Sequence, residues 1–251
     1  MSLWIAIVLG IVQALTEFFP ISSSTHLFLI KQLLGIQLSQ EHTSLLDLSC
    51  HLGSLGALIF YLRKDLCTVL QEKRQRMISL IALIPLMPLY FILKPLREFL
   101  LQENSMGYLL LGTGGILLAG QFLTMTRSKK EPSKQDALLI GAAQSMALLP
   151  GISRSASTIS CARILGWSAH DAVRFSFLLS IPTILGGNCV ELIRLSSSSI
   201  PWLALFMAFA TSLLLSMIIV KRALIWLAKG DMRLCACYCM FLGIVMIMWF
   251  S

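Results

Sequence analysis

The sequence is poor in charged residues. Only 13% of its 251 residues are Asp, Glu, Lys or Arg, whereas 57% are hydrophobic; soluble domains carry about 25% charged residues. This shortage excludes an ordinary soluble fold, and apolar runs long enough to cross a bilayer recur along the whole chain. We therefore predict an all-α polytopic membrane protein that forms a single membrane domain over residues 1–251.

Several other signatures are missing. The seven cysteines are odd in number and show no framework spacing, which excludes a disulfide-based design. The N-terminus has neither a basic n-region nor an A-x-A cleavage site, so we expect the first apolar run to be retained. Cys235, Cys237 and Cys239 do not share one helix face, and we interpret them as packing residues rather than ligands of a soft metal.

Two stretches consist of short helices on either side of a polar break. The first covers residues 2–19 and 21–35 around Pro20, and the second covers residues 136–149 and 152–166. A fifteen-residue helix reaches only ~22 Å, which is short of a ~30 Å hydrocarbon core. We predict two re-entrant helical hairpins, because non-helical backbone at membrane depth is tolerated where it lines a protein cavity.

Six further apolar segments are long enough to be transmembrane helices. They cover residues 45–62, 77–93, 106–126, 175–193, 200–220 and 234–250. Pro85 and Pro88 are expected to kink the second segment. The glycines of the third segment are expected to permit close helix contact.

The net charge of +8 is concentrated in short connections between these segments. The connections at 63–76, 127–134 and 221–233 carry thirteen Lys and Arg residues, whereas those at 36–44, 94–104 and 194–200 carry three. The positive-inside rule accounts for this bias, so we expect no nucleic-acid partner. It places the first group in the cytoplasm, so that the first hairpin opens outward and the second opens to the cytoplasm.

The two hairpins are related by an offset of 131 positions. Five residues of the first hairpin match the second: Gly10, Gln13, Ile21, Ser22 and Ser24 fall on Gly141, Gln144, Ile152, Ser153 and Ser155. Each half, about 1–126 and about 135–251, contains one hairpin and three spans. Because three is odd, we predict an inverted repeat, and such repeats place a site between their halves.

The first hairpin carries an unusual carboxylate. Gln13 and Glu17 are four residues apart and share one helix face. Ionisable groups inside a bilayer are costly and point to function, although a structural hydrogen bond to a neighbouring helix is the alternative. Asp47 and His51 lie one turn apart in the next helix, and we interpret them as peripheral.

Hydroxyl side chains follow the proline of the first hairpin. They are Ser22, Ser23, Ser24 and Thr25. One of them is expected to cap the next helix, but four hydroxyls beside free helix-terminal N–H groups also favour an anion site. His26 follows within one turn, and a hydroxyl beside an imidazole and a carboxylate is a candidate nucleophile.

The second hairpin places Arg154 in a similar break. A buried guanidinium needs an anionic partner, which is either Glu17 or a phosphate group bound in bidentate fashion. Hydroxyl donors surround it at Ser153, Ser155, Ser157 and Thr158. Serines, a histidine, a carboxylate and an arginine at membrane depth together indicate phosphate chemistry on a lipid.

The sequence resembles the undecaprenyl-pyrophosphate phosphatase family, also called the bacitracin-resistance proteins, over essentially its full length. The motifs QALTEFFPISSSTH (13–26) and PGISRSAST (150–158) carry the resemblance, supported by HLGS (51–54) and FSFLLSIP (175–182). It implies a hydrolase of the bacterial inner membrane whose active site faces the periplasm. The enzyme would remove the terminal phosphate of undecaprenyl diphosphate, recycle the carrier for peptidoglycan synthesis and give bacitracin resistance. It also implies six spans and two hairpins in an inverted repeat.

The resemblance also implies residue roles. Glu17, Ser23, His26 and Arg154 are the catalytic positions, and a divalent cation, Mg²⁺ or Ca²⁺, would use Glu17. Substrate-binding positions are Gln13, Ser22, Ser24, Ser153, Ser155 and Thr158. Gln13 stands where the family often has glutamate, and it removes a charge that could help hold this cation. Thr25 and Ala156 replace common glycines.

Two questions stay open at the sequence level. The attacking group is Ser23, His26 or a water molecule assisted by His26. Broken helices in inverted repeats are also found in transporters, so the alternative function is a transporter or flippase for a polyprenyl phosphate.

Overall fold

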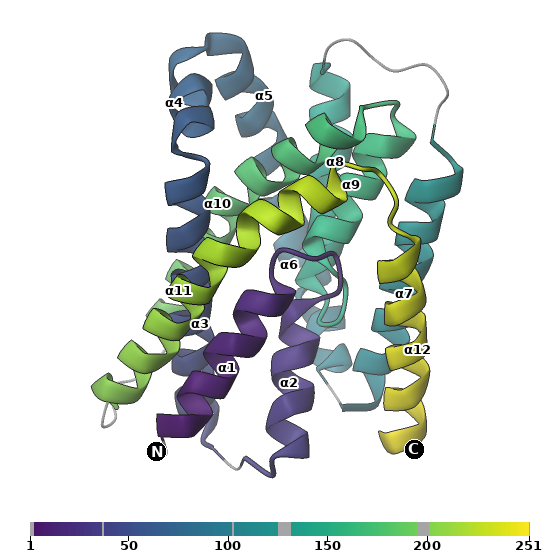
Figure 1. Cartoon of the computed structure of the whole chain (residues 1–251). Helices are drawn as coiled ribbons and strands as arrows, with labels where there is room; N and C mark the ends of the chain where they lie inside the picture. The colour runs from purple at the N-terminus through teal and green to yellow at the C-terminus, as the bar shows by residue number, and fades with distance from the viewer. Residues whose placement is uncertain (1–2, 37, 102, 125–131, 195–200, 251) are drawn as a thin grey trace.

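The computed structural model describes residues 3–36, 38–101, 103–124, 132–194 and 201–250. Within these ranges the regular secondary structure is entirely helical, which confirms the predicted all-α class (Figure 1). The helices are α1 (Leu3–Thr16), α2 (Ser23–Leu33), α3 (Gln40–Tyr61), α4 (Arg63–Gln71), α5 (Lys73–Leu83), α6 (Leu86–Leu100), α7 (Glu103–Phe122), α8 (Lys134–Ser145), the 3₁₀ turn η1 (Met146–Leu148), α9 (Arg154–Ile164), α10 (Ala169–Arg194), α11 (Trp202–Leu227) and α12 (Arg233–Phe250).

Six helical segments of the described chain are long and apolar enough to cross a membrane. They are α3, α5 together with α6, α7 from Ser105, α10, α11 and α12. They correspond one to one to the six predicted spans, and the chain is a multi-pass membrane protein. The predicted end of the third span at 126 and the predicted start of the fifth at 200 lie outside the described residues.

Two helix boundaries were predicted wrongly, both at segments rich in Lys and Arg. The predicted connection at 63–76 folds into α4 and the start of α5, and α11 runs to Leu227 instead of ending at 220. Lys and Arg are good helix formers, so a helix that has left the apolar region does not need to end. In α11 the buried residues Ala223 and Leu227 continue the packed face beyond Lys221 and Arg222.

A proline interrupts the second span, as predicted. α5 ends at Leu83 and α6 begins at Leu86, with Pro85 between them. Pro85 lacks an N–H and cannot continue the ladder of α5. Pro88 lies in the first turn of α6, where a missing N–H leaves no carbonyl without its partner.

The two broken helix pairs approach each other in the middle of the molecule. In Figure 1, α1 runs inward from the N-terminus and α2 returns to the same edge, where the C-terminal end of α12 also lies. The break after α8 contains Gly151 at φ +103, where a Cβ atom would lie 2.7 Å from the Cβ of Leu109. Only glycine fits both the backbone angle and this contact. Re-entry into a membrane and the inverted repeat stay predictions.

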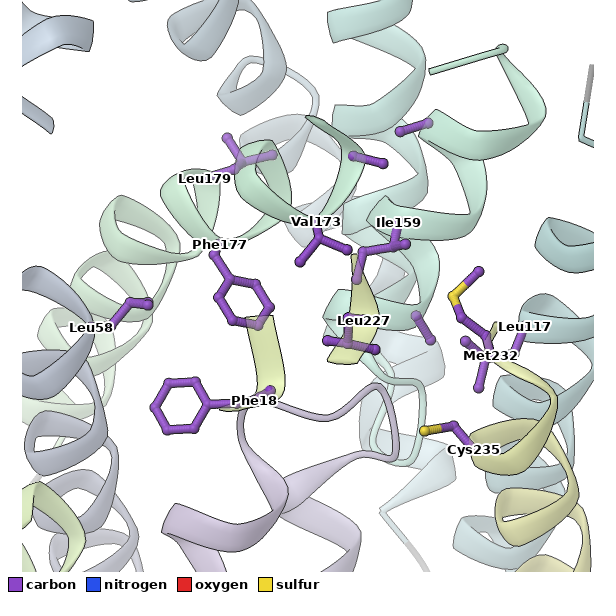
Figure 2. Packing of buried hydrophobic residues seen from close by; sticks show 14 of the residues in the cluster. Phe18, Leu58, Leu117, Ile159, Val173, Phe177, Leu179, Leu227, Met232 and Cys235 are labelled. Carbon is purple, nitrogen blue, oxygen red and sulfur yellow. The ribbon is translucent and has the colours of Figure 1, made fainter. Parts of the chain in front are cut away.

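Phe18 fixes the first break to the core. Its side chain is 2% exposed, and its ring lies 6.1 Å from the ring of Phe177 of α10. Figure 2 shows the two rings pointing toward each other, with Leu58 of α3 nearby. Dispersion contacts of this kind hold membrane helices together, because lipid tails offer no hydrophobic driving force. The neighbouring residue, Glu17, is thereby positioned on a non-helical segment.

Glycines bring α7 close to α12, as predicted. A Cβ atom on Gly107 would lie 2.9 Å from the carbonyl oxygen of Gly243, and one on Gly114 would lie 3.1 Å from that of Ala236. Gly115 is different, because a Cβ atom there meets no heavy atom within 4 Å. The contact therefore depends on particular glycines rather than on glycine content.

Gly107→Ala is expected to destabilise the protein by about 1–3 kcal/mol, the usual cost of overpacking. Gly115→Ala is the matched control on the same helix. It should leave the midpoint of thermal unfolding in detergent unchanged or raised, because alanine favours helix over glycine. Equal midpoints for the two variants would show that α7 and α12 do not depend on this contact.

Candidate active site

Glu17 lies at the centre of the site, just after α1. Its side chain is 8% exposed, and its Oε1 accepts a hydrogen bond from Nη2 of Arg154 at 2.8 Å. Its Oε2 accepts hydrogen bonds from the hydroxyl of Ser23 at 2.7 Å and from Nε2 of Gln13 at 3.0 Å. One carboxylate thus links the two breaks. Glu17 is one of the two anionic partners that the sequence predicts for Arg154, and the structure contains this ion pair.

The Ser22 hydroxyl does not cap α2. Ser22 occupies the N-cap position of α2 with φ 67 and ψ 87, and its side chain caps no backbone N–H. The predicted hydroxyl cap of α2 is therefore wrong at this position. In this left-handed conformation the Ser22 hydroxyl lies 3.3 Å from that of Ser24 and 3.0 Å from that of Thr25. The N–H groups at the start of α2 are not capped by Ser22, which suits an anion.

His26 supports the break from behind. Its Nδ1 donates to the carbonyl oxygen of Ser22 at 2.7 Å, so the proton resides on Nδ1. Its Nε2 lies 2.7 Å from the hydroxyl of Tyr238, whose ring stacks on the imidazole with centroids 5.6 Å apart. Both nitrogens are occupied, and Ser23 is bonded to Glu17 instead.

The second break positions Arg154 as the first residue of α9. Ser153 precedes it as the N-cap and accepts a hydrogen bond from the backbone N–H of Ala156 at 3.3 Å. The backbone N–H of Ser153 donates to the hydroxyl of Thr113 at 3.0 Å, and Thr113 donates to the carbonyl of Gly151 at 2.9 Å. This pair of bonds ties the break to α7.

A cavity of about 650 Å³ lies between the two breaks and is walled by α3, α6 and α10. Seven of the predicted site residues line it: Glu17, Ser22, Ser23, Ser24, Ser153, Arg154 and Ser155. Three do not: Gln13, which lies behind Glu17, His26, and Thr158, whose hydroxyl lies 2.6 Å from that of Ser176. The rest of the wall is largely apolar and includes Leu83, Leu86, Met87 and Phe91.

Residues 6–245 match the family described as bacitracin resistance protein BacA. The chain belongs to this family. Among curated proteins, several named undecaprenyl-diphosphatase are similar over most of their length. The protein of Protochlamydia amoebophila (strain UWE25) is 37% identical over 258 residues, which is all of both chains. That of Halothermothrix orenii is 34% identical over 98% of both chains, and that of Geobacter sulfurreducens is 37% identical over 80% of both.

Two residues of this BacA family member were missed as contacts of the site. His51 lines the cavity, and its Nε2 lies 3.9 Å from Oε2 of Glu17, so the peripheral interpretation is wrong for this residue. Asp47 pairs with Lys31 at 2.7 Å and does not line the cavity. The HLGS motif marked His51. Tyr238 had no local signal, because it follows His26 by 212 positions in an apolar helix.

The residues of the site fit a cation that is bound partly by a phosphate ligand better than a cation bound by protein side chains alone. Within the described residues no three His, Cys, Asp or Glu side chains cluster to hold a metal. Glu17 offers a carboxylate, and Oε1 of Gln13 is a buried oxygen with no hydrogen-bond partner among the described residues. Mg²⁺ is commonly held by one or two carboxylates together with substrate phosphates. Glu17, which lines the cavity, would therefore hold it, with phosphate oxygens completing its shell.

Proposed function

We propose that this protein is a membrane phosphatase that hydrolyses undecaprenyl diphosphate to undecaprenyl phosphate and inorganic phosphate. The observation that supports it most is the joint contact of Ser23 and Arg154 with the Glu17 carboxylate at the wall of a 650 Å³ cavity. A nucleophile, a base and an anion ligand meet there. The curated relatives carry the name of this activity.

Ser23 is the attacking group in this proposal. Its hydroxyl already donates to Glu17, which accepts the proton as Oγ bonds to the terminal phosphorus. The anhydride P–O bond breaks, and its electron pair leaves with the lipid monophosphate. Water then attacks the phosphoserine, the P–Oγ bond breaks and the serine proton returns. His26 is the weaker candidate, because its two nitrogens contact the carbonyl of Ser22 and the hydroxyl of Tyr238.

Arg154 supplies the charge that phosphoryl transfer requires. Its Nη1 is buried and has no hydrogen-bond partner among the described residues. A phosphate that takes this guanidinium in a bidentate contact also competes with Glu17 for it. The carboxylate is then freed from its ion pair and becomes a better base. The N-terminus of α2 contributes further N–H donors.

The apolar side of the cavity suits a polyprenyl tail. Met87 and Phe91 line it and are 73% and 66% exposed on α6. In a multi-pass membrane protein such side chains face lipid, so a tail can leave the cavity toward the bilayer while its diphosphate remains inside. Substrates with longer apolar chains should therefore bind more tightly than short ones.

A divalent cation, Mg²⁺ or Ca²⁺, would neutralise charge that develops on the phosphate oxygens. The protein would reside in the bacterial inner membrane with the cavity facing the periplasm, because Arg97 and Glu191 of its lining lie in or beside the connections that are poor in Lys and Arg. There it would recycle the lipid carrier of peptidoglycan synthesis and give bacitracin resistance.

Phosphate release in detergent tests the proposal. Purified protein is expected to release inorganic phosphate from undecaprenyl diphosphate when Mg²⁺ or Ca²⁺ is present, and a chelator is expected to slow the release. Detergent micelles sustain no gradient, so a transporter or flippase would release none. Absence of phosphate release under every metal condition would reject the phosphatase proposal in favour of transport.

A further inference from the structure

The cavity contains more hydrogen-bond donors than the proposed chemistry uses. Three of its lining residues have a buried N–H group with no partner among the described residues: Nη1 of Arg154, Nε2 of Gln144 and Nδ2 of Asn188. Buried donors are normally satisfied, so each exception needs an explanation. All three are donors, which predicts a ligand rich in acceptors. Arg154 is explained by the terminal phosphate, but Gln144 and Asn188 are not.

Gln144 is buried near the end of α8. It is 1% exposed, and its Oε1 lies 3.4 Å from the hydroxyl of Thr183, which donates its proton to the carbonyl of Leu179 at 2.8 Å. Thr183 also lines the cavity and comes from α10. With its oxygen turned toward Thr183, the amide of Gln144 directs Nε2 elsewhere, and there it has no acceptor.

The matching residue of the first hairpin shows what is missing. At the offset of 131 positions Gln144 corresponds to Gln13, whose Nε2 donates to Glu17 at 3.0 Å and to Ser54 at 3.2 Å. The position that corresponds to Glu17 is Leu148, which lines the same cavity but accepts no hydrogen bond through its side chain. The second amide has therefore kept its donor and has no carboxylate to receive it.

Asn188 borders open space on α10. Gly186 and Gly187 precede it and also line the cavity, and a Cβ atom on either would meet no heavy atom within 4 Å. All three residues line the cavity, which has room for a group of a ligand. A phosphate carries only acceptors on its surface and matches two amide donors without leaving a donor of its own unpaired.

We propose that Gln144 and Asn188 form a second phosphate subsite, which binds the lipid-linked phosphate next to the one that reacts at Ser23. This inference rests on the proposed function, and it makes the two amides the residues that distinguish a diphosphate from a monophosphate. Arg154 and Glu17 handle the terminal phosphate, and the amide pair holds the leaving group in place.

The test compares two inert phosphate ligands on purified protein, so it requires no turnover. Methylenediphosphonate spans both subsites, whereas orthophosphate fills one. Gln144→Leu and Asn188→Leu are each expected to weaken binding of methylenediphosphonate by about tenfold or more, as hydrogen bonds to charged groups do. Binding of orthophosphate, measured by thermal shift, should stay within about twofold.

Two further variants serve as a control and as a replacement for Gln144→Leu. Ser216→Ala removes another buried hydroxyl that has no hydrogen-bond partner among the described residues. It lies on α11 and does not line the cavity, so the substitution should change neither affinity. Gln144→Glu keeps the size of the side chain, and its carboxylate should repel the diphosphonate, so it replaces Gln144→Leu if that variant does not fold. Equal losses for both ligands, or none for either, would overturn the subsite. A wild type that hydrolyses nothing would reject the phosphatase while leaving this binding test intact.

Discussion

Glu17→Gln is expected to lower kcat for phosphate release from undecaprenyl diphosphate by about 10²–10⁴-fold, the usual contribution of a general base. The amide keeps the shape of the carboxylate, and it can still accept one of the bonds from Ser23 and Arg154. It cannot take the proton of Ser23. Ser23→Ala should produce a loss of similar size, and the double variant should lose little more, because the two residues act as a unit.

A structural explanation of the Glu17 result can be separated from a catalytic one. Removing one partner of a buried ion pair is destabilising, so the midpoint of thermal unfolding must be measured alongside kcat. Asp47→Asn is the matched control, because it breaks the Lys31 pair on α3 without touching the cavity lining. It should leave kcat unchanged. Wild-type kcat in Glu17→Gln would mean that the site lies elsewhere.

Arg154→Lys is expected to reduce kcat/KM by about 10³-fold, in the range that an arginine contributes to phosphoryl transfer. Lysine keeps the positive charge opposite Glu17 but lacks the planar fork that binds phosphate in a bidentate contact. Arg154→Ala should cost at least as much and should also unfold at lower temperature, because Glu17 is left as an unpaired buried charge. The measurement is steady-state phosphate release across substrate concentrations.

Arg163→Lys provides the comparison for Arg154. Both arginines lie on α9, but Arg163 donates to the carbonyl of Trp167 at 2.9 Å and does not line the cavity. Its replacement should change kcat/KM by less than about twofold. If Arg154→Lys behaved like Arg163→Lys, the guanidinium would be a structural partner of Glu17 and no more.

The chemistry of the site was more predictable than its contacts. A carboxylate and an arginine in broken apolar helices stand out because a bilayer penalises charge, and they identified Glu17 and Arg154. The role of His26 against Tyr238 depends on a residue 212 positions away that looks like any other aromatic in a span. His51 was underestimated for a similar reason, because its approach to Glu17 is set by the packing of α3 rather than by spacing.

Some features of the fold could likewise be predicted from the sequence, and others could not. Length and hydropathy located all six spans, whereas helix ends were misplaced where Lys and Arg continue a helix, as in α4 and α11. The prediction of a side-chain cap for α2 was wrong at Ser22, because this residue adopts a left-handed backbone conformation that amino-acid preference alone does not predict. Local sequence preferences therefore predicted the structure best at positions where no contact with a distant part of the chain competed with them.

The backbone of Ser22 has a consequence for sequence change at this position. It is the only residue other than glycine with a positive φ in the part of the chain that is described. Such a conformation costs about 1–3 kcal/mol for a serine and almost nothing for a glycine. Selection for thermal stability alone would therefore replace Ser22 by glycine. In an engineered, more stable homologue, a stability-driven design would therefore remove a hydroxyl from the wall of the cavity at this position.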